Sequence, residues 1–221
     1  MKLIQLNATS RRIFPGSLAY AWEQRKLGDV FSYIPNNTLS RANLNNESGE
    51  IKSVHYGDIL VRYGSVLDVA NDEISFISNG NVADFKNQLL SNGDVIFADT
   101  AEDETVGKAV EMHGISDIPV VSGLHTMACR PNIKFAPKYL GYYINSPSYH
   151  DQLRTLMQGI KVLAISKTNL SKTIVSFPKS EQEQTDIGQL FSNLDNLITL
   201  HQREFITFLI FRFNLTQTMT S

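Results

Sequence analysis

The feature that most constrains this sequence is a seam of large side chains near its C-terminal end. They recur in alternating steps of four and three residues, the spacing of the a and d positions of a coiled coil. From residue 181 to residue 204 the chain has no proline and one early glycine, so the spacing predicts a helix roughly 35 Å long. The seam consists of Ile187, Phe191, Leu194, Ile198, His201, Phe205 and Phe208, and it is widened by Leu190 and Leu197.

Local signals mark where this helix starts. Ile174–Pro178 has the composition of a short β-strand that ends at a proline. Ser180, followed three residues later by Glu183, forms a capping box. The plainer interpretation is a helix buried in a core. We favour a helix that pairs with another copy, because its apolar face is wider than a small domain can cover. The residues expected at this dimer interface are Ile187, Phe191, Leu194, Ile198 and His201.

Four segments of the chain resemble type I restriction–modification specificity subunits. The first of them is similar to the family segment that precedes its long spacer helices. It consists of Phe177-Pro178 with Glu181-Gln182, followed by Ile187-Gly188, Leu190 and Leu194-Asp195. Three further matches follow the family's order, so the resemblance covers about residues 20–204. These three segments are Trp22–Asp29, Gly93–Thr100 and Val121–Thr126.

The resemblance implies an α+β fold: a curled, mixed β-sheet target-recognition domain with short helices, then one long C-terminal helix suited to antiparallel coiled-coil pairing. Family members usually carry two such domains and two such helices in about twice this length. We find no internal duplication, so the chain resembles half of a specificity subunit. The expected parts are an N-terminal arm at 1–21, the recognition domain at 22–179, and the helix with its tail at 180–221. The apolar run Phe205–Phe213 departs from the family's lysine-rich helix end.

Within the domain, turn residues and β-branched runs predict the elements. Gly57–Gly64 and Gly93–Ala98 each read as a Gly-Asp turn followed by a strand, and Pro35–Glu50 as a polar loop. Short helices are expected at Leu27–Tyr33, Pro137–Tyr143 and Ser148–Met157, with Pro137 in the first turn of one and Ser148 with Asp151 capping the other. Further strands are expected at Glu73–Ile77, Lys108–Met112, Val120–Leu124 and Met127–Arg130.

The net charge of −2 hides a strongly basic segment. Residues 131–180 carry seven lysines and arginines against Asp151 alone, and the segment also holds four tyrosines. Basic groups among aromatic residues suit a phosphate-facing surface, although a solvated face explains the charge equally well without the resemblance. The candidate DNA-binding residues lie on three loop-like stretches, of which 158–167 ranks first because it falls in the basic segment. They are Arg62, Tyr63, Ser65, Thr105, Lys108, Gln158, Lys161, Ser166 and Lys167.

The motifs of catalysis are missing from the sequence. It has no Pro-Pro pair, no Gly-x-Gly and no P-loop, and Glu50-Ile51-Lys52 has no Pro-Asp partner of the kind a nuclease needs. Its five histidines and Cys129 lack zinc-ligand spacing, and His125 is more easily explained as a hydrogen-bonded scaffold residue. A single cysteine and the lack of a membrane span or signal peptide favour the cytoplasm. We therefore expect neither catalytic nor metal-binding residues.

The leading hypothesis is a non-catalytic subunit that binds one half of a bipartite double-stranded DNA target. By the resemblance, its partners are a DNA methyltransferase (modification) subunit, a restriction/translocase subunit and a second copy of itself. S-adenosylmethionine, ATP and Mg²⁺ would belong to those partner subunits. The alternative is an oligomerisation or decoy protein that keeps the helix and partner docking but does not read DNA.

Overall fold

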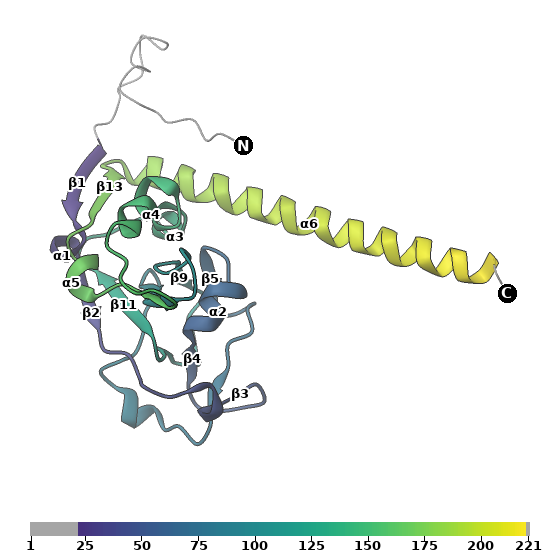
Figure 1. Ribbon diagram of the computed structural model, residues 1–221, viewed down its shortest axis with the longest axis horizontal. Coiled ribbons are helices and arrows are strands. Elements are labelled where there is room, and N and C mark those ends of the chain that lie inside the picture. Colours follow the sequence, from purple (N-terminus) through teal and green to yellow (C-terminus); the bar gives the residue numbers. More distant parts are fainter. Residues whose placement is uncertain (1–21, 220–221) are drawn as a thin grey trace, which may run out of the picture.

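One long helix projects from a small α+β domain in the computed structural model of the chain (Figure 1). The structure describes the backbone of residues 22–219 and the side chains of residues 22–209. The helix, α6, spans Glu181–Met219, and the domain's elements end with the strand β13 (Ile174–Pro178). The expected α+β class and the long C-terminal helix are confirmed. The arm expected at 1–21 lies outside the described residues.

A five-stranded mixed sheet forms the middle of the domain, in the order β2-β11-β7-β9-β5. Only β5 runs parallel to its neighbour, β9, and the other pairs are antiparallel. The strands expected around 95–98, 108–112 and 127–130 belong to this sheet. The five strands are β2 (Phe31–Ile34), β5 (Val66–Asp68), β7 (Val95–Ala98), β9 (Ala109–His113) and β11 (Thr126–Pro131).

This sheet is covered on both faces, which explains the unbroken apolar run of β7. Val95 and Phe97 join a core with the helices α3 (Tyr139–Ile144) and α4 (Pro147–Arg154), whereas Ile96 and Ala98 join a second core on the other face. Successive side chains of a strand point to opposite faces, so a strand buried on both sides must be apolar throughout. The second core also contains residues of the helix α2 (Tyr56–Val61).

The expected curled, mixed sheet is confirmed, and the remaining strands form a second mixed sheet and two short ribbons beside it. The second sheet has the order β10-β4-β6-β3, with β10 parallel to β4. Its strands are β3 (Leu44–Asn45), β4 (Lys52–Val54), β6 (Phe76–Ile77) and β10 (Val120–Ser122). The ribbons pair β1 (Trp22–Lys26) with β13 and β8 (Thr100–Ala101) with β12 (Leu163–Ala164). Short helical turns are α1 (Leu27–Val30), η2 (Arg41–Asn43), η3 (Val82–Phe85) and α5 (Lys167–Leu170).

The strand predicted within Gly57–Gly64 is wrong, because this segment forms α2. His55 is the N-cap, and its Nδ1 accepts a hydrogen bond from the Gly57 amide at 3.1 Å. The Asp58 carboxylate lies buried in the first turn, where the helix dipole favours negative charge. A short apolar run such as Ile59–Val61 is compatible with a strand or a helix, and the N-cap favours the helix.

Other element boundaries also differ from the prediction. The helix expected at Leu27–Tyr33 stops at Val30, because the following residues pair with β11. The helix expected from Pro137 begins at Tyr139, after Lys138 in the left-handed region (φ 71°). The helix expected from Ser148 begins at Pro147, with Ser146 as its N-cap in place of Ser148. The strand expected at 73–77 is only the two-residue β6, and the polar loop at 35–50 contains η2 and β3.

Side chains of the first turns of α6 fasten it to the domain. The buried Gln184 accepts a hydrogen bond from the Ala136 amide at 2.9 Å and donates to the Pro178 carbonyl at 2.8 Å. The Ser180 hydroxyl accepts from the Glu183 amide, as the capping box predicts. The Glu183 carboxylate accepts a hydrogen bond from the Trp22 indole at 3.1 Å. These bonds link the helix to both strands of the β1–β13 ribbon.

The next turns of α6 pack on α3. The Tyr142 hydroxyl donates to the Asp195 carboxylate at 2.8 Å, and its ring stacks on Phe191 at a centroid distance of 5.5 Å. Ile187 packs against the first core, so the beginning of the seam is used within the chain. Every described side chain from residue 196 to 209 is exposed, including Ile198, and the helix continues to Met219. Its 39 residues correspond to ~58 Å. No helix among residues 22–219 has the length and hydrophobicity to cross a bilayer.

A buried carboxylate joins the central sheet to α3. The Glu111 side chain of β9 accepts hydrogen bonds from the amides of Lys138 (2.6 Å) and Gly141 (2.9 Å), at the N-terminal end of α3. Burial raises the pKa of Glu111 to about 7, against the lowering effect of these amide donors. Gly141 permits this close packing, because a Cβ there would lie 2.2 Å from the Ser65 carbonyl oxygen.

We predict that Glu111 makes stability fall with rising pH between about 4.5 and 7. In that range the folded chain holds a proton that the unfolded chain has released, so the carboxyl's contribution to the free energy of unfolding decreases as pH rises. The slope is at most about 1.4 kcal/mol per pH unit. Urea unfolding of the unmodified chain and of Glu111→Gln at pH 5, 6 and 7 measures this contribution. It is the difference between the free energies of unfolding of the two proteins at each pH. A difference that does not change with pH would contradict the prediction.

Candidate nucleic-acid interface

The segment 158–164 forms a hairpin that stands on a well-packed base. The backbones of Gln158 and Ala164 exchange two hydrogen bonds, at 3.0 and 2.8 Å. β12 pairs with β8, and the next residue, Ile165, is buried in the first core while its amide donates to the Asp99 carbonyl at 2.9 Å. The base of the hairpin is therefore fixed to the domain by backbone bonds and apolar packing.

The tip of this hairpin carries side chains that are largely exposed to solvent. Ile160 is 100% exposed, Val162 is 50% exposed and Lys161 is exposed. Within the part of the chain that the structure describes, the side chains of Gln158 and Lys161 make no hydrogen bond or ion pair. Gly159 shapes the turn with φ 130°, and a Cβ there would lie 1.9 Å from the Val162 carbonyl oxygen. The tip thus presents an amide, an ammonium group and two apolar side chains to solvent.

The two other predicted residues of this stretch lie at α5. The Ser166 hydroxyl accepts a hydrogen bond from the Asn169 amide at 3.2 Å and caps the helix. The Lys167 ammonium lies 5.5 Å from the centre of the Tyr33 ring, within the range of a cation–π contact. Burial raises the pKa of Tyr33 to about 12, so the ring carries a neutral hydroxyl. Lys167 remains exposed, six residues after Lys161 in the sequence.

The start of α2 and the loops beside the hairpin contribute an aromatic and acidic cluster that the sequence did not reveal. Tyr56 lies between two imidazole rings, with centroid distances of 4.7 Å to His55 and 5.3 Å to His125. His125 Nδ1 is 3.4 Å from Asp99, which also accepts a hydrogen bond from the Thr100 hydroxyl of β8 at 2.7 Å. Because Thr100 pairs with Ala164, the cluster adjoins the hairpin. His125 is half-exposed, with a left-handed φ of 55°, so it offers a ring edge to solvent in addition to its scaffold contact.

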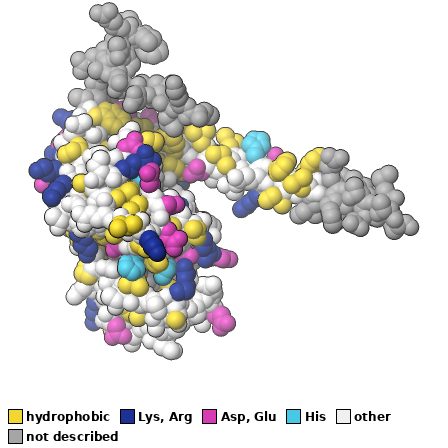
Figure 2. Space-filling view, viewed as in Figure 1, with side chains coloured by type: hydrophobic (Ala, Val, Ile, Leu, Met, Phe, Trp, Pro, Cys, Tyr) yellow, Lys and Arg dark blue, Asp and Glu magenta, His cyan; other side chains and the backbone are white. Residues whose placement is uncertain are grey.

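A buried carboxylate holds this cluster in place. Asp58 accepts hydrogen bonds from both terminal nitrogens of Arg41, at 2.8 and 2.9 Å, and Arg41 also lies 3.3 Å from the His55 ring. The bidentate bond to Asp58 raises the pKa of Arg41. Burial, and then the charge of Arg41, lower the pKa of His55, so that ring is neutral near pH 7. Figure 2 shows two histidine side chains close together in the middle of the domain, beside basic and hydrophobic side chains.

The remaining predicted DNA-binding residues lie at a different place, next to α6. Tyr63, Ser65, Thr105 and Lys108 line a cleft of about 370 Å³ together with Asp195, and none of the hairpin residues lines it. The Lys108 ammonium donates to the carbonyls of Leu60 (3.1 Å) and Tyr63 (2.9 Å), and burial lowers its pKa.

Apart from Ser65, the residues of this second set have side-chain polar groups that already have partners within the domain. The Tyr63 hydroxyl donates to the Glu73 carbonyl at 2.9 Å, and Arg62 pairs with the Glu73 carboxylate at 2.8 Å. The Thr105 hydroxyl donates to Asp103. The sequence placed these residues in loops, but it could not show that their donors are used to join the domain's elements.

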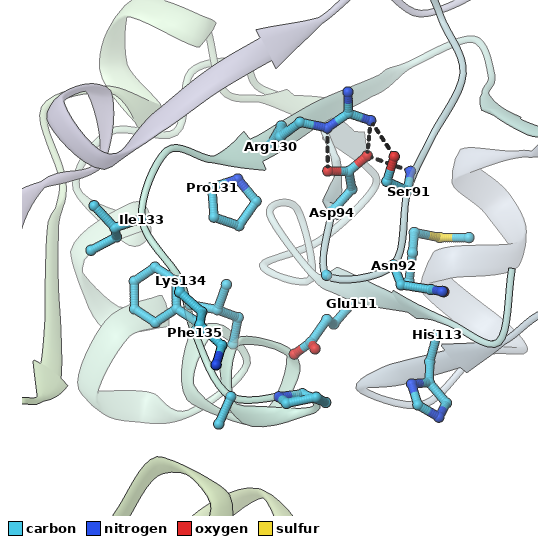
Figure 3. Close-up of a pocket in the computed structure, with 15 residues that line it drawn as sticks. Ser91, Asn92, Asp94, Glu111, His113, Arg130, Pro131, Ile133, Lys134 and Phe135 are labelled. Carbon is cyan, nitrogen blue, oxygen red and sulfur yellow. Dashed lines mark hydrogen bonds and ion pairs between the residues drawn. The ribbon is translucent and has the colours of Figure 1, made fainter. Parts of the chain in front are cut away.

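A larger cleft, of about 600 Å³, lies where β9 and β11 end (Figure 3). Arg130 donates to both oxygens of the buried Asp94 at 2.9 and 2.7 Å, and Glu111 and His113 line the other side. Asp94 also accepts from the Ser91 amide, so its charge is fully used within the chain. Among the described residues, no group of His, Cys, Asp and Glu side chains is placed to hold a metal ion. We interpret this cleft as structural.

Comparison with known proteins assigns the family. The family model described as "Type I restriction modification DNA specificity domain" matches residues 20–206. The chain belongs to this family. A comparison with curated proteins gives no match. The family match spans the whole α+β domain, both clefts, the hairpin and the described exposed part of α6 as far as residue 206.

Solved structures share the fold of this specificity domain. A structure described as showing complex assembly and conformational transition of the type I R-M system has a TM-score of 0.56 at 17% identity. The HsdS subunit from Thermoanaerobacter tengcongensis has a TM-score of 0.53 at 18% identity, and the S subunit from M. genitalium 0.53 at 14%. The matches cover 86–87% of this chain but only 42–45% of those chains. This chain therefore spans less than half the length of these structural relatives.

We predict that Gly159→Ala rearranges the hairpin tip without unfolding the domain. Alanine is strained at φ 130° and its Cβ would clash with the Val162 carbonyl, but the tip lies outside every core. Limited proteolysis should show faster cleavage near residue 160, with a midpoint of thermal unfolding close to that of the unmodified chain. Gly64→Ala is the control, because no atom lies within 4 Å of a Cβ there. Unchanged cleavage in Gly159→Ala would contradict the prediction.

Proposed function

We propose that the domain binds one half of a bipartite double-stranded DNA target through the 158–164 hairpin, and that it catalyses no reaction itself. The observation that carries this proposal is the place of Lys161 at the exposed tip of the hairpin, in contrast to three paired cations of the basic segment. Lys134 and Arg154 pair with carboxylates, and Lys138 donates to Ser192. Lys161 has no partner among the described residues, so its charge is available to a phosphate.

The groups around Lys161 suit sequence reading as well as phosphate binding. Gln158 has a free side-chain amide, and such an amide can bond adenine at two positions in the major groove. Tyr56 and His125 add a hydroxyl and an imidazole beside the hairpin. Phosphate contacts set the register of a protein on DNA, whereas contacts to base edges discriminate between sequences. The hairpin and the adjoining loops provide both kinds of group on one side of the domain.

We predict that Lys161→Ala weakens DNA binding and reduces its salt dependence. Each lost phosphate contact lowers the slope of log affinity against log salt by about one. The same is expected of Lys167→Ala, whose ammonium is exposed above the Tyr33 ring. Fluorescence anisotropy of the chain assembled with its modification subunit, measured from 50 to 200 mM salt, tests both. Lys86→Ala is the matched control, because it removes an exposed lysine beside η3, outside the hairpin and α5. If the two variants bind with unchanged affinity and slope, the hairpin does not face DNA.

We further propose that two copies pair through antiparallel α6 helices. Leu194 (43% exposed), Ile198 (54%) and Leu197 (54%) lie on one face of the helix, beyond the turns that pack on α3. Each such side chain gains roughly 1.5–3 kcal/mol when it is buried. Identical helices that pair in opposite directions are related by a two-fold axis, which puts the two domains at opposite ends. Identical domains read identical half-sites, so the target would be an interrupted palindrome.

The predicted interface differs along its length. Ile187 and Phe191 already contact the domain, so they support the direction of the helix, while Leu194, Ile198 and His201 remain available to a partner. His201 is exposed, with its Nδ1 3.6 Å from the Glu204 carboxylate. In this arrangement a methyltransferase (modification) subunit and a restriction/translocase subunit would dock on the pair. S-adenosylmethionine, ATP and Mg²⁺ would bind to those partner subunits.

We predict that Leu194→Asp makes the chain monomeric. A carboxylate in the paired face would be buried without a partner, which strongly opposes association. Light scattering at tens of micromolar should give the mass of a dimer for the unmodified chain and of a monomer for the variant. Asn196→Asp is the control, because it adds the same charge on the opposite side of the helix. A monomeric unmodified chain, or an asymmetric methylation motif that depends on this gene alone, would overturn the homodimer.

The second candidate function is a decoy that keeps α6 and partner docking but does not read DNA. It is favoured by the firm attachment of α6, which needs no DNA contact. The two functions differ in one measurement: binding to mixed-sequence duplex and its salt slope, with and without the modification subunit. A decoy would bind the subunit and add nothing to its affinity for DNA.

A further inference from the structure

Ile160 is the most exposed large apolar side chain among the described residues. Its side chain is 100% exposed, although the domain has three apolar cores that bury most residues of its kind. Single exposed apolar residues are common on protein surfaces, so exposure alone assigns no role. Ile160 is unusual because it lies at the tip of a protruding hairpin, next to Lys161 and two residues from Gln158, whose polar groups have no partner among the described residues.

The shape of the hairpin restricts the groove that it can enter. Its two arms are joined at one β-bridge, where Gln158 and Ala164 exchange two backbone hydrogen bonds, and β12 pairs on its other side with β8. An element two chains wide fits the major groove of B-DNA, which is about 12 Å wide, but not the minor groove, which is about 6 Å wide. An apolar side chain that reaches the floor of the major groove meets one apolar group there, the C5-methyl of thymine.

We propose that Ile160 is a specificity-determining residue that contacts the C5-methyl group of a thymine in the major groove. This inference rests on the proposed function, because it requires the hairpin to face DNA. Ile160 then contributes to the choice of base at one position, Lys161 binds a phosphate, and Gln158 bonds a neighbouring base edge. The base of the hairpin keeps the side chain in position, since Ile165 anchors it in the first core.

The test removes one methyl group from the DNA and the matching side chain from the protein. The full chain is assembled with its modification subunit, and the duplex carries the methylation motif found in cells that express this gene. Each thymine is replaced in turn by deoxyuridine, which lacks only the C5-methyl. For the unmodified chain, replacing the contacted thymine of one half-site should weaken binding by about fourfold, the value of one buried methyl group. For Ile160→Ala, the same replacement should have no effect.

A matched variant separates this contact from general damage to the hairpin. Val162→Ala shortens the neighbouring, half-exposed apolar residue and should keep the deoxyuridine effect of the unmodified chain. Ile160→Ala should keep the full salt slope, because Lys161 is unchanged.

Three results would overturn the inference while leaving DNA binding in place. The first is a methylation motif without thymine. The second is a deoxyuridine effect that is the same in Ile160→Ala and in the unmodified chain. The third is a rise in the fluorescence of 2-aminopurine placed in the duplex, which would show that Ile160 unstacks bases as a wedge. Failure of the proposed function is seen separately, since Lys161→Ala would then leave affinity and salt slope unchanged.

Discussion

The attachment of α6 to the domain depends on one buried amide. Gln184 satisfies the Ala136 amide and the Pro178 carbonyl, two backbone groups about forty residues apart in sequence. A buried backbone group without a partner costs about 1–3 kcal/mol, so this side chain makes one orientation of the helix far more favourable than others. The contacts of Glu183, Tyr142 and Asp195 extend the attachment over four turns. The direction in which the exposed part of α6 leaves the domain is therefore fixed by polar contacts together with the first two residues of its apolar seam, Ile187 and Phe191.

In the hairpin, the residues that stabilise the fold are separate from the residues at the exposed tip. Its base is part of the first core through Ile165, and its closing pair is fixed by two backbone hydrogen bonds. Its tip contributes nothing to any core. Substitutions at the tip are therefore expected to change binding with little effect on folding. The cluster of His55, Tyr56 and His125 is also held by contacts beneath the surface, since the buried Asp58 carboxylate binds Arg41, which lies beside the His55 ring. Such a domain can vary the residues that meet a ligand while the supporting elements stay constant.

Several elements followed directly from local sequence. The apolar run Val95–Ala98 predicted a buried strand, and the seam and the Ser180 cap predicted the long helix, because these signals depend only on neighbouring residues. Gly57–Gly64 was predicted as a strand and is α2, since the cap is a histidine and not one of the usual N-cap residues. Glu111 gave no signal at all, because a carboxylate in a strand becomes a helix cap only when α3 is placed against it.

The sequence by itself determined the order of the main elements, the long helix and the family. All three depend on short-range patterns of residues. It also proposed the 158–167 stretch as a DNA-binding candidate, from Gln158 and Lys161 beside a glycine in a basic segment. Only the tertiary structure decided which predicted residues are available to a ligand. Lys108 and Lys161 look equivalent in sequence, yet Lys108 donates to two carbonyls inside the domain and Lys161 stands on an exposed tip. The physical reason is that the partners of Lys108 come from α2 and its C-terminal end, more than forty residues away, and sequence spacing carries no record of such contacts.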